Sequence, residues 1–275
     1  MRSYQLILCS LILFINCTEA DKKKPRTKEI EAEQEKLEPG NNKISALKSP
    51  DNNLLTDSIA ELYSGFWLNE DFLQQVEQNK SIYRSTEFQG VLFGFTLDKK
   101  DLLTGKAGIN GFTVHEGGLG APIAWHDKLH CFTTSGEVDE QSSLPKAMDL
   151  ILSETNQIEF QFETGDSYFY RKVESEITEL RKILFAGSYT DIKDYNYLFQ
   201  EDGRISGFNN FSKYSVLYDF GEGLYFDTII LTNDQNNEEL LYHYRISNDT
   251  LRLYEITGEL PQYAIGELKF ELVKE

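Results

Sequence analysis

The residues with the clearest potential for metal chemistry are a histidine pair beside a cysteine. His126, His130 and Cys131 lie within six positions, and His115 lies upstream. Zinc takes three or four nitrogen, sulfur or oxygen ligands in a tetrahedron. On a helix the pair would share a face, but the segment predicts a tight hairpin with His126 opposite Leu129 and His130 pointing away. The spacing therefore does not favour a metal site, and we expect no cofactor.

Other motifs typical of enzymes are either absent from the sequence or too common to identify a catalytic site. The glycine-rich stretch Glu116–Gly120 lacks the Lys-Ser/Thr of a phosphate-binding loop, and no Gly-x-Ser-x-Gly elbow occurs. Carboxylates are abundant, but a catalytic pair is defined by its separation in space, which the sequence does not give. We therefore assign no catalytic residue, and a hydrolase with carboxylates in a cleft is the third of three functional readings.

Aromatic side chains are the candidates for ligand binding. Tyrosine offers an apolar wall and a polar tip, which suits a pocket for a small molecule. The alternative is that these residues fill cores and cover sheets. The candidates are Trp67, Tyr218, Tyr225, Tyr242, Tyr244, Tyr254 and Tyr263.

Three of these tyrosines, Tyr242, Tyr244 and Tyr254, belong to a predicted hairpin over Glu239–Gly258. A two-residue turn at Asn248-Asp249 sets its register. The pairs are Ile246 with Leu251 and Tyr244 with Leu253 on one face, and Arg245 with Arg252 on the other. An apolar face opposite a charged face is typical of a half-buried antiparallel pair.

A similar hairpin is predicted about a hundred residues earlier, over Leu150–Gly165. Its loop is Glu154–Asn156, with Asn156 left-handed. The pairs are Leu152 with Ile158, Leu150 with Phe160, and Met148 with Phe162. Both hairpins end in Thr-Gly and lead into another aromatic strand, so the pattern predicts two copies of one antiparallel β unit.

The strand pattern predicts a mostly β protein, an antiparallel meander or barrel, because short apolar runs alternate with turn residues. We favour two tandem units, residues 56–174 and 184–275, over one large barrel built from both halves. A helical connector is expected over residues 175–183, and Glu70–Gln78 predicts a further short helix.

Composition limits the partners. The chain has 275 residues and a net charge of −18, so nucleic acid would meet like charge over most of the surface. Aromatic residues make up 13%, which suits half-buried strands. Cys131 is the one cysteine that can belong to the fold, so no intrachain disulfide is expected.

The N-terminus has the layout of an export signal. Arg2 is followed by an apolar run, Leu6–Ile15, that is too short to span a bilayer, and the run stops just before Cys17. This stretch resembles a bacterial lipoprotein leader, which implies a signal peptide over residues 1–16 and a Cys17 acylated with fatty acids such as palmitate. An ordinary cleaved signal and an uncleaved short anchor are the alternatives.

A charged tether is expected after the leader. Residues 17–55 are rich in Lys, Glu, Pro and Asn, a composition that cannot bury enough apolar surface to fold. The lipoprotein resemblance implies attachment to the bilayer through Cys17. Thr18, in place of an acidic residue, implies the outer membrane within the cell envelope.

A second resemblance concerns the first β unit. Gly65-Phe66-Trp67, with Arg171 late in the unit, is similar to the pattern of the lipocalin or calycin superfamily. The resemblance implies that Trp67 closes one barrel end and that Arg171 stacks on it. Gly187-Ser188-Tyr189 stands at the corresponding place in the second unit.

These features predict a lipid-anchored envelope protein that binds a small apolar or amphipathic ligand or another envelope component. The first alternative is a structural or interaction lipoprotein with filled barrels and no ligand, whose outer surface contacts a partner protein or a glycan. Barrel interiors offer cavities and rim loops offer selectivity, so an interior packed with side chains would favour that alternative.

Overall fold

The structure is a computed structural model, and the predicted leader, Cys17 and nearly all of the linker lie outside the residues that it describes. Those residues are 55–113, 118–134, 148–220, 224–233, 235–236, 238–259 and 262–275. No helix in these ranges is long and apolar enough to cross a membrane.

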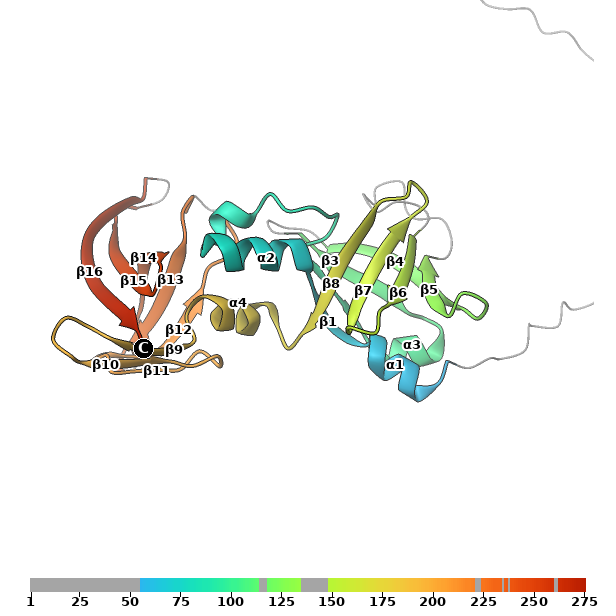
Figure 1. The fold of residues 1–275 in the computed structure, drawn as a ribbon, viewed down its shortest axis with the longest axis horizontal. Coiled ribbons are helices and arrows are strands. Elements are labelled where there is room, and N and C mark those ends of the chain that lie inside the picture. The colour runs from blue at the N-terminus through green and yellow to red at the C-terminus, as the bar shows by residue number, and fades with distance from the viewer. Residues whose placement is uncertain are drawn as a thin grey trace, which may run out of the picture. The chain divides into compact units, whose positions relative to one another are not determined.

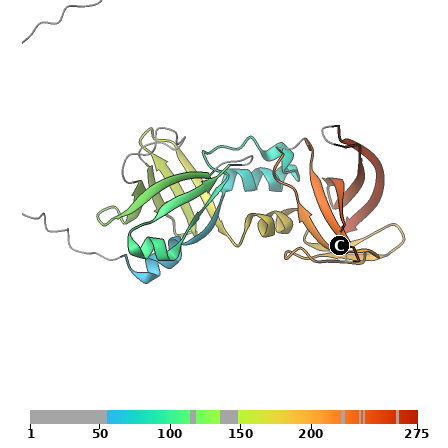
Figure 2. The same cartoon turned by 180° about the vertical axis from the view of Figure 1, so that it is seen from behind.

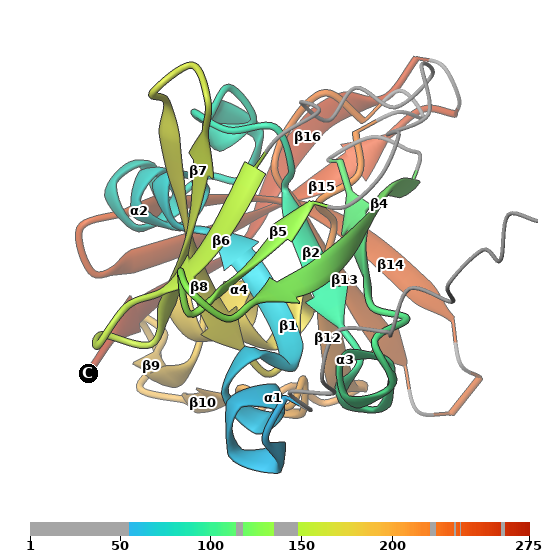
Figure 3. The ribbon, with the colours of Figure 1, turned by 90° about the vertical axis from the view of Figure 1, so that its right-hand side faces the viewer.

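The first sheet is a closed barrel of strands that follow one another in chain order (Figure 1 and Figure 3). Each strand pairs antiparallel with the next, and β1 also pairs with β8. The strands are β1 (Gly65–Asn69), β2 (Gly94–Leu97), β3 (Gly108–Phe112), β4 (Gly118–His126), β5 (Cys131–Thr134), β6 (Met148–Leu152), β7 (Gln157–Phe162) and β8 (Ser167–Val173).

The second sheet also has eight strands, in the order β11-β10-β9-β16-β15-β14-β13-β12. Arg204, the residue just before edge strand β11, forms an isolated bridge with Lys213 of the other edge strand, β12. The strands are β9 (Gly187–Thr190), β10 (Asn196–Phe199), β11 (Ile205–Ser206), β12 (Phe211–Val216), β13 (Thr228–Asn233), β14 (Glu239–Ser247), β15 (Thr250–Thr257) and β16 (Ala264–Lys274). The prediction of a mostly β chain with two tandem units joined by a short helix is therefore confirmed.

Four short α-helices and one 3₁₀ turn accompany the sheets in the described ranges. They are α1 (Asp57–Tyr63), α2 (Glu70–Asn79), η1 (Tyr83–Ser85), α3 (Lys99–Thr104) and α4 (Glu176–Leu184). The Asn69 side chain caps α2 by accepting from the Phe72 N–H at 2.9 Å, and Ser175 caps α4 in the same way. The predicted helix at Glu70–Gln78 is confirmed as α2. It begins directly after β1, which still pairs with both β2 and β8.

Both predicted hairpins have the predicted register. In β14–β15, Ile246 faces Leu251 and Tyr244 faces Leu253. In β6–β7, the three apolar pairs form as expected and Asn156 is left-handed, with a φ of 58°.

The β4–β5 turn differs from its prediction. His126 pairs with Cys131 and not with Leu129. The cause is His130, which adopts a left-handed φ of 53° and makes the turn two residues longer.

The first barrel is filled by its own aromatic side chains. Trp67, Phe95, Phe160 and Tyr170 are all fully buried. Phe95 lies 6.2 Å from Trp67, 4.8 Å from Phe160 and 5.1 Å from Tyr170, measured between ring centroids. Such distances are those of rings in contact, so this interior is packed with side chains.

The core of the second sheet is continued by helices that lie outside it. Phe72 and Val76 of α2, and Leu180 of α4, belong to the same buried cluster as Phe185 and Tyr244. The two helices lie side by side (Figure 1 and Figure 2). A helix encoded between the first two strands of the first sheet therefore helps to complete the core of the second.

In each sheet, an aromatic ring in the first strand of the sequence is covered by a lysine from the last strand. The Lys172 ammonium lies 5.6 Å from the Trp67 ring, and the Lys274 ammonium lies 5.8 Å from the Tyr189 ring. The prediction that Arg171 stacks on Trp67 is therefore wrong. Lys172 is the β8 residue directly opposite Trp67, and its neighbour Arg171 points to the other face of the strand.

A glycine precedes each of these two rings for the same steric reason. Gly65 has a φ of 120° and Gly187 a φ of 141°. A Cβ on Gly65 would lie 2.9 Å from Lys172 Cε, and one on Gly187 would lie 2.7 Å from Lys274 Cε. The backbone angle therefore requires glycine at both positions, and a side chain there would also push the covering lysine aside.

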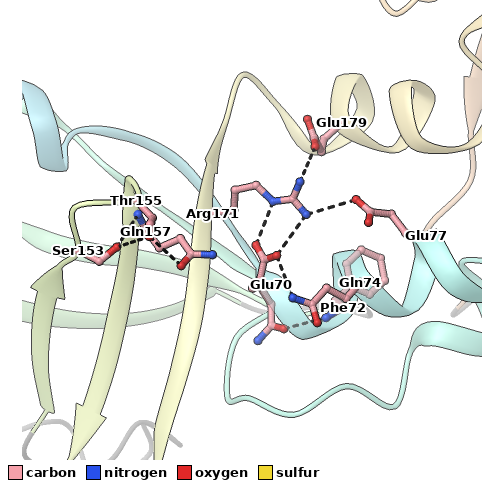
Figure 4. A network of polar contacts seen from close by, with 10 residues as sticks. Glu70, Phe72, Gln74, Glu77, Ser153, Thr155, Gln157, Arg171 and Glu179 are labelled. Atoms are coloured by element: carbon pink, nitrogen blue, oxygen red, sulfur yellow. Dashed lines mark hydrogen bonds and ion pairs between the residues drawn. The ribbon is translucent and has the colours of Figure 1, made fainter.

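Arg171 instead connects β8 to both helices through three carboxylates (Figure 4). Its guanidinium contacts Glu70 at 2.9 Å, Glu77 at 3.5 Å and Glu179 at 3.4 Å. Glu70 and Glu77 belong to α2 and Glu179 to α4. The role of Arg171 is therefore to hold the two helices against the first barrel.

Candidate functional site

A pocket of about 540 Å³ lies on the second sheet, and we call it the aromatic pocket. Its walls are the β9–β10 turn, the segment between β11 and β12, and the middle of β16. The lining residues used below are Lys193, Tyr197, Phe208, Phe211, Lys269 and Phe270. This volume falls in the range typical of small-molecule sites, which are often found at barrel mouths.

The pocket exists because β9 is short. β9 ends at Thr190 and pairs with only Val273 and Lys274 at the end of β16. Phe270 and Lys269 precede that pairing, so they have no β9 neighbour. Aromatic side chains from the β11–β12 segment occupy part of the resulting gap.

Phe208 is the centre of the aromatic wall. Its ring centroid lies 4.7 Å from that of Tyr197, 5.1 Å from Phe270 and 6.2 Å from Phe211. Tyr242 of β14 packs against Phe270, with 5.9 Å between the ring centroids, but does not itself line the pocket. Except for the buried Tyr197, the rings that line the pocket are only partly buried, so they present apolar faces to it.

Asp191 fixes the shape of the β9–β10 turn at the edge of the pocket. Its carboxylate accepts from the backbone N–H groups of Lys193 at 2.8 Å and Tyr195 at 3.0 Å. The Tyr197 hydroxyl donates to it at 3.1 Å. Burial alone would raise the pKa of Asp191, but these hydrogen bonds outweigh it and lower that pKa. The turn therefore holds Lys193 beside the rings.

A second pocket, of about 510 Å³, lies between the α2–η1 segment, the residues just before β13 and strand β14, and we call it the arginine pocket. The lining residues used below are Ser81, Arg84, Tyr225, Asp227, His243 and Arg245. It therefore combines side chains from both halves of the sequence within one compact unit.

Asp227 is the polar centre of the arginine pocket and is 9% exposed. Ser81 Oγ donates to Oδ2 at 2.5 Å, and Oδ1 accepts from the Tyr83 N–H at 2.9 Å and the Tyr244 hydroxyl at 3.2 Å. Burial, with the negative charge of Asp227, raises the pKa of Tyr244. The hydrogen bonds tie η1 to β14 and satisfy the buried carboxylate.

His243 is held as one neutral tautomer by its partners. Nδ1 lies 2.8 Å from the Asp227 carbonyl oxygen, which can only accept, so Nδ1 carries the proton. Nε2 accepts from Arg245 Nε at 3.1 Å. Burial lowers the pKa of His243, and the charges of Arg245 and Arg84 lower it further. Both ring nitrogens are occupied, so the imidazole is not placed to take a proton from Ser81.

The candidate tyrosines lie in or next to the two pockets and in the cores. Tyr242 contacts Phe270 behind the aromatic pocket without lining it, while Tyr225 and Tyr244 line the arginine pocket. Tyr254 lies under Arg245, with 5.3 Å between the ring centroid and Cζ. Tyr263 precedes β16 and is partly buried.

The other two aromatic candidates have structural roles. Trp67 is fully buried, and its Nε1 donates to the Tyr63 carbonyl at 2.9 Å. Tyr218 stacks on Phe93 at 5.8 Å and donates to Glu176.

Little in the sequence pointed to the residues that matter most in the pockets. Phe208 and Phe211 flank Asn209-Asn210, and aromatic residues beside a turn were the one signal that could have identified them. Arg84 and His243 carry no motif. Their proximity depends on contacts between segments about 160 residues apart.

No group of three or more His, Cys, Asp or Glu side chains in the described ranges is arranged to hold a metal ion. The chain matches no protein-family model, no curated protein sequence and no solved structure at a significant level. The pockets are therefore interpreted from their own geometry.

Proposed function

We propose that this chain is a binding protein of the cell envelope, tethered through Cys17, that holds a small amphipathic ligand in the aromatic pocket. The observation that carries the proposal is the set of contacting, partly buried rings around Phe208 in a gap of the second sheet. Apolar faces in a concave site supply most of the affinity of small-molecule sites, and a few polar groups set orientation.

The polar edge of the pocket favours a ligand with a polar end. Lys193 is exposed beside the rings, and Asn209 and Asn210 add amide groups. Lys269 is already engaged, since its ammonium lies 2.9 Å from Glu255. Lys193 is therefore the charged group with most freedom to contact a ligand.

The filled barrel interiors support placing the ligand outside them. Trp67, Phe95 and Phe160 fill the first interior, and Phe185, Phe199 and Tyr244 are buried in the second. A ligand inside either would have to displace well-packed side chains, which is costly.

Filled interiors also favour a second candidate function, an interaction protein without a small ligand. In that case the same aromatic rings would contact a partner protein of the envelope. Retention of a small molecule during purification distinguishes the two functions.

Native mass spectrometry of the full-length protein, purified from its own host, tests the proposal. We expect an added mass on the parent protein and its loss in Phe208→Ala and Lys193→Glu. Lys193 is exposed, so its variant should fold normally. Phe169→Ala, at an exposed ring of β8, is the matched control and should keep the ligand. A bare mass for the parent protein would favour the interaction function.

The tether is tested separately. Cys17→Ala should move the protein from the membrane fraction to the soluble fraction, because acyl chains supply the membrane affinity. A variant that partitions as the parent does would contradict the lipid anchor.

A further inference from the structure

The arginine pocket is a positively charged exception on an acidic protein. The net charge of the chain is −18, yet Arg84 and Arg245 both line this pocket. Within the described ranges neither guanidinium forms an ion pair with a carboxylate. Arg171, Arg204 and Arg252 do form such pairs, with Glu70, Asp202 and Glu271.

Asp227 offsets only part of the positive charge of the pocket. It is the one carboxylate among the residues that line the pocket in the described part of the chain. Its oxygens already accept from Ser81, from Tyr244 and from a backbone N–H. These donors stabilise the buried carboxylate, and neither Arg84 nor Arg245 is among its partners, so the two guanidiniums remain available to a ligand.

Arg245 is preorganised. Its Nε donates to His243 Nε2 at 3.1 Å, and its Cζ lies 5.3 Å from the Tyr254 ring centroid. The His243 ring is itself fixed through Nδ1 by the Asp227 carbonyl. A guanidinium held at Nε and stacked on a ring keeps its two terminal NH₂ groups free for a planar acceptor.

Arg84 converges on the same place from the other half of the sequence. Its backbone N–H donates to Ser81 Oγ at 3.1 Å, and Ser81 is bound to Asp227. The Arg84 charge is close enough to His243 to lower the pKa of that imidazole. Two guanidiniums from separate segments therefore act on one cavity, and the exposed Tyr225 stands beside it.

We infer that the arginine pocket binds the oxyanion group of a small ligand, a carboxylate or a phosphate, between Arg84 and Arg245. Arginine recognises such groups through paired N–H donors, and charge-assisted hydrogen bonds are the strongest of the neutral-pH polar contacts. Tyr225 supplies an apolar face for the body of the ligand. This site is separate from the aromatic pocket and does not depend on the function proposed for it.

Isothermal titration of the full-length protein with inorganic phosphate and with acetate, each at constant ionic strength, tests the inference. We expect saturable one-site binding of at least one of these anions. Arg84→Gln and Arg245→Gln should each weaken it about tenfold or more, as expected for loss of a hydrogen bond to a charged group. Arg204→Gln and Arg252→Gln remove arginines elsewhere on the second sheet and should leave the affinity unchanged.

Arg245→Gln could disturb His243, so Arg84→Gln is the more direct variant, and the melting temperatures of both report on folding. Equal losses in all four variants would indicate general charge screening and overturn the inference. So would a parent protein that binds neither anion at millimolar concentration. A ligand retained in the aromatic pocket would be unaffected by either result.

Discussion

The first and last strands of the two sheets share the same local structure, but the sheets differ in how they close. Each begins with a left-handed glycine two residues before a buried ring, and a lysine from the last strand covers that ring. Each ring also donates to the carbonyl four residues earlier, Trp67 to Tyr63 at 2.9 Å and Tyr189 to Phe185 at 2.8 Å. The repeated local chemistry shows that one structural solution is used twice in this chain.

The two sheets differ in how completely they close into a barrel. β1 and β8 pair over four residues, Phe66 to Asn69, whereas β9 and β16 pair over two. At the other side, the residue before β11, Arg204, forms one isolated bridge with Lys213 of β12. Fewer pairs leave a gap at the β9–β10 turn, and the aromatic pocket occupies that gap. The less regular sheet is therefore the one with space for a ligand.

The largest expected effect tests whether the buried rings of Trp67 and Tyr189 contribute equally to the free energy of unfolding. Trp67→Ala should destabilise the protein by about 3–5 kcal/mol, because it removes a fully buried aromatic side chain and leaves a cavity. Tyr189→Ala removes a smaller ring and should fall at the lower end of that range. Urea unfolding followed by circular dichroism measures both. A loss below about 1 kcal/mol for Trp67→Ala would contradict the packed first barrel.

The next effect concerns the dependence of the second sheet on the α2–η1 segment. Asp227→Ala leaves the Ser81 and Tyr244 hydroxyls without their acceptor in a buried site, which should cost about 1–3 kcal/mol. Asp227→Asn keeps an acceptor oxygen and should cost less.

Glu70→Ala is the comparison at the link between α2 and the first sheet. Arg171 keeps Glu179 and Glu77 as partners, and this network is partly exposed, so the loss should be below about 1 kcal/mol. If Glu70→Ala destabilised the protein more than Asp227→Ala, the Arg171 network would be the stronger link. The same urea unfolding series measures all three variants.

A smaller difference should appear between the two covering lysines. Lys274→Met removes a cation–π contact and should cost about 0.5–1 kcal/mol. Lys172→Met should cost more, because the Lys172 ammonium also donates to the Glu61 and Leu62 carbonyls at 3.0 and 3.2 Å. Thermal unfolding of the two variants compares them. Equal losses would mean that these carbonyl contacts contribute nothing measurable.

The sequence predicted what depends on local periodicity. The β14–β15 and β6–β7 registers followed from alternation and turn residues, because a one-residue slip would move every apolar side chain to the wrong face. The same rule explains the error at Arg171. Two adjacent basic residues point to opposite faces of β8, and the sequence did not reveal which of them faces Trp67.

What the sequence could not predict depends on partners distant along the chain. The apolar face of α2 was readable, but its burial against the second sheet was not, because amphipathicity identifies a face and not what covers it. The aromatic pocket depends on where β9 stops pairing with β16. The arginine pocket depends on Ser81 meeting Asp227, a contact between residues 146 positions apart.

The smallest expected effect is a pH dependence of stability that arises from His243 in the second sheet. The folded protein lowers the pKa of His243 below its usual value of 6.5, chiefly through burial, so the unfolded chain binds its proton first as the pH falls. Stability should therefore be unaffected above about pH 7 and should decrease as the pH falls below 6.5 toward the folded pKa. His243→Gln should remove that part of the decrease, and melting temperatures of both proteins between pH 7.5 and about 5 measure it. An unchanged pH profile in the variant would mean that His243 is not held as the neutral tautomer, and the preorganisation of Arg245 would lose its support.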